Sequence, residues 1–225
     1  MKISKKEGIF EPTGTTKLLY GQICKIVKKK NLILDLGCGS GVIGFQIAED
    51  FKKKIFMSDI SYNAISLAKK KAKEFKIKAD IRLGSLFDCW NDKKFDLIIC
   101  DVAGVSEKIS SYTPWYKNRV PNGSGDDGTK NIVAVLESAK KYLNKNGVLL
   151  VAIISLSNHK KILKKANSNF KIVKLIDKSN WPLPKELYKY KNKLSILKNK
   201  KLIDYIIKFN MIIYWTEIYL IKNPR

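Results

Sequence analysis

Residues 31–44 of the chain read Asn-Leu-Ile-Leu-Asp-Leu-Gly-Cys-Gly-Ser-Gly-Val-Ile-Gly, and this stretch decides the fold. The apolar run Asn31–Leu36 predicts a buried strand. Three glycines at alternate positions follow it, and an amphipathic helix is expected from Val42. Glycine has no Cβ, so the backbone can turn sharply there and come close to a ligand. A strand, a glycine-rich turn and a helix N-terminus in this order are typical of a nucleotide-binding unit.

The chain has 225 residues, of which 45% are apolar, enough for one well-filled domain. Its first residues lack the apolar core of a signal peptide, and its longest apolar run, Val148–Ile154, is too short to span a bilayer. The four cysteines are scattered without a CxxC pair, and His159 is the single histidine. This pattern argues against a metal site and favours a reducing compartment. We therefore expect a soluble cytoplasmic protein that binds neither a metal nor a membrane.

The net charge of +24 leaves two interpretations open. Only three of the 44 basic residues are arginine, the residue that recognises phosphates and bases through two hydrogen bonds. Lysine, isoleucine and asparagine are abundant together, as in an AT-rich coding sequence. The charge therefore reflects either solvated lysine without a partner or a surface that binds a polyanion.

Apolar segments that alternate with amphipathic helices predict a parallel sheet with helices on both faces. Strands are expected at residues 31–36, 54–59, 77–83, 95–100, 148–155, 171–176 and 211–221, with helices between most of them. Residues 1–225 are expected to form a single domain. The last strand follows a lysine-rich insertion at about 181–209, which predicts an antiparallel strand added to the edge of the sheet.

The glycines of the first turn allow two registers. Gly39, Gly41 and Gly44 match the GxGxxG fingerprint of dinucleotide-binding proteins, and Asp59 lies at a suitable distance to hold a ribose. The other register begins at Asp35 and takes in the three alternate glycines. A carboxylate aimed at the turn would repel a pyrophosphate, whereas it suits a ligand that carries an ammonium and a sulfonium group. The acid therefore favours S-adenosyl-L-methionine as the cofactor.

In this second register the chain resembles the class I S-adenosylmethionine-dependent methyltransferases over roughly residues 9–155. Leu34–Gly41 resembles their first motif, and Phe95–Asp101 resembles the strand that leads to the transfer site. The resemblance implies an α/β fold with a Rossmann-like, seven-stranded, mostly parallel sheet and helices on both faces. It also implies a set of cofactor-binding residues, namely Asp35, Gly37, Cys38, Gly39, Gly41, Asp59, Ile60, Ser85, Leu86 and Asp101.

The resemblance gives these residues separate roles. Asp35 would orient the methionine part of the cofactor, and the glycines would admit the cofactor to the turn. Asp59 matches the acid that holds both ribose hydroxyls. Ser85 and Leu86 would flank the adenine, and Asp101 would lie beside the transferring methyl group.

The flanking segments resemble a narrower group, the HemK-like glutamine methyltransferases that modify translation release factors. Phe10–Leu19, with the sequence FEPTGTTKLL, resembles their opening motif and implies that Thr16 helps to close the cofactor site. Ser124–Gly128 resembles the Gly-Gly-x-Asp-Gly segment that precedes the next helix in that family. The similarity is closest to the archaeal and eukaryotic branch, which lacks an N-terminal substrate domain.

Two positions depart from the HemK-like pattern. Ser85 stands where family members usually have an acid, and the transfer motif Asn-Pro-Pro-Tyr is replaced by Asp101–Gly104, with the sequence Asp-Val-Ala-Gly. The family motif orients a poorly nucleophilic amide or aromatic amine nitrogen in line with the methyl group. A carboxylate accepts protons but cannot donate them, and the prolines and the ring are missing. We therefore expect an altered acceptor site.

Asp101 is accordingly the predicted catalytic residue. Its carboxylate would take a proton from a hydroxyl or an ordinary amine, or would hold a cationic substrate. Tyr112, Trp115 and Tyr116 are predicted to line the acceptor pocket in place of the missing ring; alternatively, they only pack a loop onto the core. Arg119 in the same loop would hold a carboxylate or phosphate of the substrate, or is simply a surface residue.

The sequence favours a HemK-like methyltransferase that acts on a protein side chain or a small metabolite through this altered site. The alternative enzyme methylates ribosomal or transfer RNA, and its affinity for RNA would fall steeply with salt. The third hypothesis is a non-catalytic accessory protein that binds S-adenosylmethionine.

Overall fold

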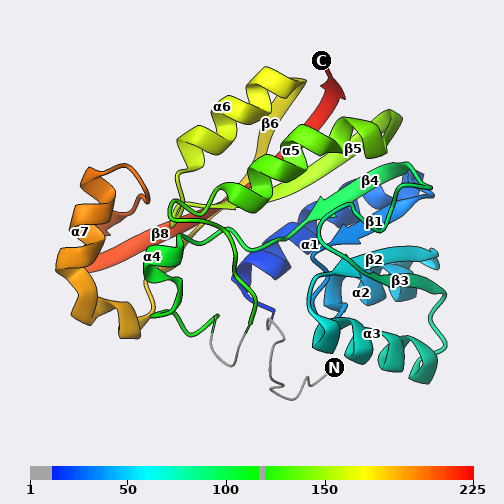
Figure 1. Ribbon diagram of the computed structural model, residues 1–225, viewed down its shortest axis with the longest axis horizontal. Coiled ribbons are helices and arrows are strands. Elements are labelled where there is room, and N and C mark those ends of the chain that lie inside the picture. Colours follow the sequence, from blue (N-terminus) through cyan, green and yellow to red (C-terminus); the bar gives the residue numbers. More distant parts are fainter. Residues whose placement is uncertain (1–11, 117–119) are drawn as a thin grey trace.

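The described chain is built around an eight-stranded sheet with the order β3-β2-β1-β4-β5-β8-β6, in which β7 also pairs with β8 (Figure 1). The computed structural model describes residues 12–116 and 120–225. The strands are β1 (Ile33–Leu36), β2 (Ile55–Asp59), β3 (Ala79–Leu83), β4 (Phe95–Cys100), β5 (Leu143–Ile154), β6 (Phe170–Pro182), β7 (Ile206–Lys208) and β8 (Met211–Pro224). The helices are α1 (Gly14–Ile26), η1 (Val27–Lys29), α2 (Val42–Phe51), α3 (Tyr62–Glu74), α4 (Glu107–Ser110), α5 (Lys130–Tyr142), α6 (His159–Asn169), η2 (Lys185–Tyr190) and α7 (Lys191–Asn199).

Strands β3, β2, β1, β4 and β5 run parallel, which confirms the predicted mostly parallel sheet. The chain places β2 and β3 on one side of β1 and then returns to place β4 on the other side. At such a reversal the loops after two neighbouring strands diverge and leave a crevice at the carboxyl ends of the strands. The turn after β1 and the loop after β4 therefore mark the expected ligand site.

Helices cover both faces of the sheet, as predicted (Figure 1). Neighbouring residues of a strand point to opposite faces. Ile33 and Leu97 pack with α1, α2 and α3, whereas Leu34 and Ile98 pack with α5 and α6. Each such side chain contributes about 1.5–3 kcal/mol when it is fully buried. Helix α3 begins after Ser61, because the Ser61 hydroxyl accepts a hydrogen bond from a backbone N–H of the first turn.

The last strand is antiparallel, as predicted, but the predicted position at the sheet edge is wrong. Strand β8 lies between β5 and β6, and β6 forms the edge. Most of β8 is buried, with Ile218 and Ile221 fully covered, whereas most of β6 is exposed or half-buried. The more apolar strand takes the inner position because neighbours on both sides shield it from water.

Residues 183–210, between β6 and β8, correspond to the predicted lysine-rich insertion. They fold into η2, α7 and β7, and the short strand β7 was not predicted. Their apolar side chains form a separate cluster with Val105, Ile109 and Leu156, which follow β4 and β5 in the chain. The insertion therefore packs at the carboxyl end of the sheet, beside α4 at the left of Figure 1.

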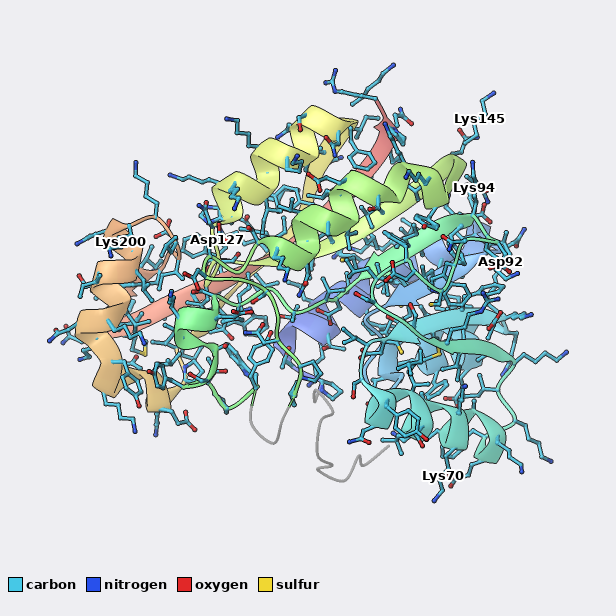
Figure 2. The ribbon with its side chains drawn as sticks, in the orientation of Figure 1. Lys70, Asp92, Lys94, Asp127, Lys145 and Lys200 are labelled. Atoms are coloured by element: carbon cyan, nitrogen blue, oxygen red, sulfur yellow. The ribbon has the colours of Figure 1, made fainter. Side chains whose placement is uncertain are left out.

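The lysines that carry the net charge are dispersed. Figure 2 shows Lys70 and Lys200 projecting outward from separate parts of the molecule, and Lys94 and Lys145 from a common corner, and all four are exposed. Residues 183–210 are nevertheless more basic than the rest, with eight lysines and two acidic residues. Within the described part of the chain, no helix is long and apolar enough to cross a membrane.

Candidate cofactor and acceptor site

A cavity of about 460 Å³ lies at the carboxyl ends of β1, β2 and β4. Its walls come from the turn after β1, the end of β2, the loops after β3 and β4, and the first turn of α1. The residues predicted from the sequence that line it are Thr16, Asp35, Gly37, Cys38, Gly39, Asp59, Ile60, Ser85, Leu86, Asp101, Trp115 and Tyr116. The fold thus gathers residues that are far apart in the sequence around a single space.

Gly37 brings the turn after β1 against the loop after β4. Its φ angle is +77°, in the left-handed region that favours glycine, and a Cβ added there would lie 2.9 Å from Cγ1 of Val102. Any side chain at this position would therefore be strained and would push the two walls of the cavity apart. This close approach explains why the turn needs glycine.

Two carboxylates of the donor side are held by backbone N–H groups. Oδ2 of Asp35 accepts a hydrogen bond from Gly44 at 3.0 Å, and the two oxygens of Asp59 accept from Gly39 and Ser61, both at 2.8 Å. Burial and, to a smaller extent, the nearby charge of Asp101 raise the pKa of Asp35 to about 7. Burial also raises the pKa of Asp59. The hydrogen bonds therefore fix both carboxyls in position. Their burial disfavours the ionised form unless a positive charge compensates it.

Asp101 follows β4 and is joined to the first turn of α1. Its carboxylate accepts a hydrogen bond from the hydroxyl of Thr16. Oγ1 of Thr16 in turn accepts a hydrogen bond from the backbone N–H of Thr13 at 3.2 Å, which closes the capping box of α1. Burial raises the pKa of Asp101 to about 6. At neutral pH this carboxyl is therefore mainly ionised and accepts hydrogen bonds only.

Three aromatic side chains line the same cavity as Asp101. Trp115 and Tyr214 meet edge to face, with their ring centroids 5.6 Å apart. The hydroxyl of Tyr116 accepts hydrogen bonds from the backbone N–H groups of Gly104 and Val105, and burial and the charge of Asp101 raise the pKa of this hydroxyl. The ring of Tyr116 is therefore anchored to the loop after β4.

Within the described part of the chain, two predicted site residues are not found on the cavity wall. Gly41 is the N-cap residue of α2 and packs against Phe45 instead. Tyr112 stacks on Tyr190 of the insertion, at 4.1 Å between ring centroids, so it packs a loop, as the alternative interpretation holds. Arg119 lies outside the described residues.

The sequence did not single out several residues that do line the cavity, among them Asn122, Lys130, Asn131 and Tyr214. Asn131 donates hydrogen bonds to the backbone oxygens of Ala103 and Asn122 and so holds two loops together. Nδ2 of Asn122 is buried, finds no hydrogen-bond partner among the described residues, and is a candidate donor to a ligand. No motif spacing marks these positions, although Asn122 adjoins the Ser124–Gly128 segment.

The glycines that line the cavity support the register that begins at Asp35. Gly37, which belongs only to this register, lines the cavity, whereas Gly44, which belongs only to the dinucleotide register, packs against β2, as does Gly41, which both registers share. A Cβ on Gly44 would lie 2.9 Å from Sδ of Met57, and one on Gly41 would lie 2.7 Å from its Cε. These two glycines therefore serve the contact between helix and strand.

The charges on the cavity wall fit a cationic cofactor. Asp35, Asp59 and Asp101 all line it, and burial raises the pKa of each. A pyrophosphate would add negative charge, whereas the ammonium and sulfonium groups of S-adenosylmethionine would compensate it. Among the described residues, no group of three His, Cys, Asp or Glu side chains is placed to hold a metal ion.

The fold and the cavity define an α/β protein with a cavity at the point where its strand order reverses, the place where such sheets bind nucleotide-type cofactors. A family model described as "Methyltransferase domain" matches residues 27–210, and the chain belongs to this family. The family and the fold together imply the use of S-adenosylmethionine.

The curated relatives include glutamine methyltransferases. The chain is 32% identical over 124 residues to the release factor glutamine methyltransferase of Borreliella burgdorferi, an alignment that covers 53% of this chain and 43% of the relative. It is 28% identical over 169 residues to a Methanocaldococcus jannaschii protein provisionally named as a protein N5-glutamine methyltransferase, covering 73% of this chain and 82% of the relative. The chain spans about half the length of the bacterial release factor enzymes that it matches.

Solved structures show the same fold at low sequence identity. The ribosomal protein L11 methylase of Lactobacillus delbrueckii superimposes with a TM-score of 0.57 at 15% identity, covering 96% of this chain and 83% of the other. A methyltransferase from Pyrococcus furiosus gives a TM-score of 0.57 at 14% identity, covering 97% and 88%. These similarities confirm the predicted Rossmann-like fold.

Proposed function

We propose that the chain is a HemK-like, S-adenosylmethionine-dependent methyltransferase that acts on a protein side chain or a small metabolite. The observation that carries this proposal is the single cavity that joins Asp35 and Asp59 to Asp101 and the aromatic wall. A donor site and an acceptor site must share one space for direct transfer of a methyl group.

The donor side would bind the cofactor through fixed groups. Asp59, held by two backbone N–H groups, would accept hydrogen bonds from the ribose hydroxyls. Asp35 would face the cationic methionine part, with Gly37 and Gly39 allowing close approach. Ser85 and Leu86 would flank the adenine. The bound cofactor supplies a methyl group on a sulfonium, which is already activated for transfer.

The acceptor side would work by orientation and by accepting a proton. The carboxylate of Asp101 can accept a hydrogen bond or a proton from an N–H or O–H group. It has no N–H to offer the carbonyl oxygen of an amide, unlike the asparagine of the HemK-like motif. Trp115 and Tyr116 would exclude water from the transferring group. The names of the relatives specify glutamine as the acceptor, and we therefore do not propose glutamine as the acceptor of this chain.

The basic insertion favours one second candidate, an RNA methyltransferase. A ribosomal RNA small subunit methyltransferase C of Actinobacillus pleuropneumoniae is 26% identical over 164 residues, covering 72% of this chain and 44% of the relative. The eight lysines of residues 183–210 would contact phosphates. A filter-binding titration with ribosomal RNA from 50 to 200 mM salt tests this candidate, because phosphate contacts make affinity fall steeply with salt.

Calorimetric titration tests the cofactor. We expect S-adenosylmethionine and S-adenosylhomocysteine to bind the wild-type protein, and NAD to bind far more weakly. Asp59→Ala removes the predicted ribose contact and should weaken binding by at least about tenfold. Asp88→Ala, at an exposed position, serves as the matched control. Preferential binding of NAD would overturn the proposal, and cofactor binding without turnover on any acceptor would favour the accessory-protein hypothesis.

A further inference from the structure

Asp101 uses little of its hydrogen-bonding capacity within the protein. An ionised carboxylate offers about four lone-pair positions. Among the residues that the structure describes, the hydroxyl of Thr16 contacts it, and no lysine or arginine forms an ion pair with it. Asp59, in the same cavity, accepts several backbone N–H hydrogen bonds. The remaining acceptor positions of Asp101 are therefore available to a ligand.

Among the described residues, Asp35 and Asp59 of the same cavity also lack an ion pair, whereas two little-exposed carboxylates outside the cavity have one. Asp127 pairs with Lys161, and Glu217 pairs with Lys178. The chain has 44 basic residues, so cations are not scarce. A half-buried carboxylate costs free energy unless a cation or several donors compensate its charge. We therefore expect the compensating charge at Asp101 to come from a ligand.

The surroundings of Asp101 suit an organic cation. Trp115, Tyr116 and Tyr214 line the same cavity, and the charge of Asp101 acts on the hydroxyl of Tyr116. Aromatic rings attract ammonium groups and also cover their alkyl substituents. Contacts within the protein hold these rings in place, so this part of the site is formed before a ligand arrives.

Resting on the proposed function, we propose that this end of the cavity binds an organic ammonium group, and that the methyl acceptor is an alkyl amine. Asp101 pairs with the N–H groups of the ammonium, and the rings cover its alkyl carbons. Asp101 then accepts one proton from R–NH₃⁺, which leaves R–NH₂ with a free lone pair beside a neutral carboxyl. A neutral amide would leave the carboxylate unpaired, and an anionic acceptor would be repelled by the three aspartates.

The test uses n-butylammonium as the probe, with n-butanol and butyramide as neutral analogues of similar size. Each is titrated by NMR into wild-type protein saturated with S-adenosylhomocysteine, and binding is read from shifts of the indole and backbone signals near Trp115. We expect the ammonium probe to bind at least about tenfold more tightly than either neutral compound. Equal binding of the three compounds would overturn the inference.

Asp101→Asn removes the charge and keeps the size of the side chain. We expect this variant to lose at least about tenfold in affinity for the ammonium probe and little for n-butanol. Asp88→Asn, at an exposed position outside the cavity, should bind all three compounds as the wild type does. Unchanged binding of the ammonium probe by Asp101→Asn would refute the role of this carboxylate. If that variant does not fold, the wild-type comparison of ammonium and alcohol decides the question.

Titrating S-adenosylhomocysteine by itself, and the ammonium probe with and without it, separates this inference from the proposed function. If S-adenosylhomocysteine binds and the ammonium probe does not, the amine site is wrong and the methyltransferase proposal stands. If the ammonium probe binds in an Asp101-dependent way and S-adenosylhomocysteine does not bind, the amine site stands and the methyltransferase proposal fails.

Discussion

The hydroxyl of Thr16 donates a hydrogen bond to the carboxylate of Asp101, and this contact joins the first turn of α1 to the end of β4. Thr16 can donate there because its oxygen is oriented by the backbone N–H of Thr13. The opening segment of the chain therefore sets the position and the charge of the predicted catalytic residue.

Removal of this hydroxyl should raise the pKa of Asp101. We expect Thr16→Val to raise it by about one unit above the value of about 6, because the ionised form loses a charge-assisted hydrogen bond. A carboxyl-carbon NMR titration measures the change. Thr16→Ser keeps the hydroxyl and should restore the wild-type pKa. An unchanged pKa in Thr16→Val would show that the hydrogen bond does not control this carboxylate.

The charge of Asp101 should make the ligand-free protein less stable as the pH rises. Its pKa is raised from 3.8 to about 6, so the folded state binds the proton more tightly than the unfolded chain does. The resulting stabilisation is complete below about pH 4 and is lost as the pH rises through 6. Asp101→Asn should therefore be about 1–2 kcal/mol more stable than wild type at pH 7.5, with a smaller difference at pH 4.5. Urea denaturation at the two pH values measures this, and a variant that is less stable at pH 7.5 would contradict the account.

Gly37→Ala should damage both the fold and the donor site. The added Cβ would meet Val102 at 2.9 Å in a backbone with φ of +77°. We expect a loss of about 2–3 kcal/mol in the free energy of unfolding and a severalfold loss of affinity for S-adenosylhomocysteine. Gly21→Ala is the matched control: nothing lies within 4 Å of its added Cβ in α1, so it should be stabilising by up to about 1 kcal/mol. Equal effects of the two substitutions would argue against the close approach at Gly37.

Trp181, at the end of β6, should support the cofactor site from a distance. A Cβ on Gly14 would lie 2.6 Å from its ring, and its indole N–H donates to Thr216, whose hydroxyl also contacts Thr15. We expect Trp181→Ala to loosen the start of α1 and to weaken binding of S-adenosylhomocysteine by about fivefold, as measured by calorimetry. Trp181→Phe keeps a ring over Gly14 and should lose less. Wild-type affinity in Trp181→Ala would show that α1 does not depend on this contact.

The parallel part of the fold was predictable because its signals are local. The apolar run that forms β1, the glycines after it and the cap at Ser61 each specify a strand, a turn or a helix start within a few residues. The order of the last strands was not predictable in this way. The exchange of β6 and β8 depends on which strand buries more apolar surface, and strand β7 has three residues that are all exposed.

The donor and acceptor sides of the site also differed in how far the sequence could predict them. The donor residues lie directly after strands, and the carboxyl ends of parallel strands meet at one edge of the sheet. Their positions in the sequence were therefore enough to predict that they lie together. The acceptor wall depends on the path of a long loop. Nothing in the sequence distinguishes the role of Tyr112 from that of Tyr116, which lies in the same loop. In the structure, however, Tyr112 stacks on Tyr190 and Tyr116 lines the cavity. Tyr214 reaches the cavity from β8, whose position in the sheet the sequence did not reveal.

A crystal structure of the wild-type protein with S-adenosylhomocysteine tests the central claim most directly. We expect the ribose hydroxyls to contact Asp59 and the sulfur to point toward Asp101, with open space between the sulfur and the rings of Trp115 and Tyr116. A ligand bound outside this cavity, or one whose ribose lies away from Asp59 and whose sulfur points away from Asp101, would contradict it.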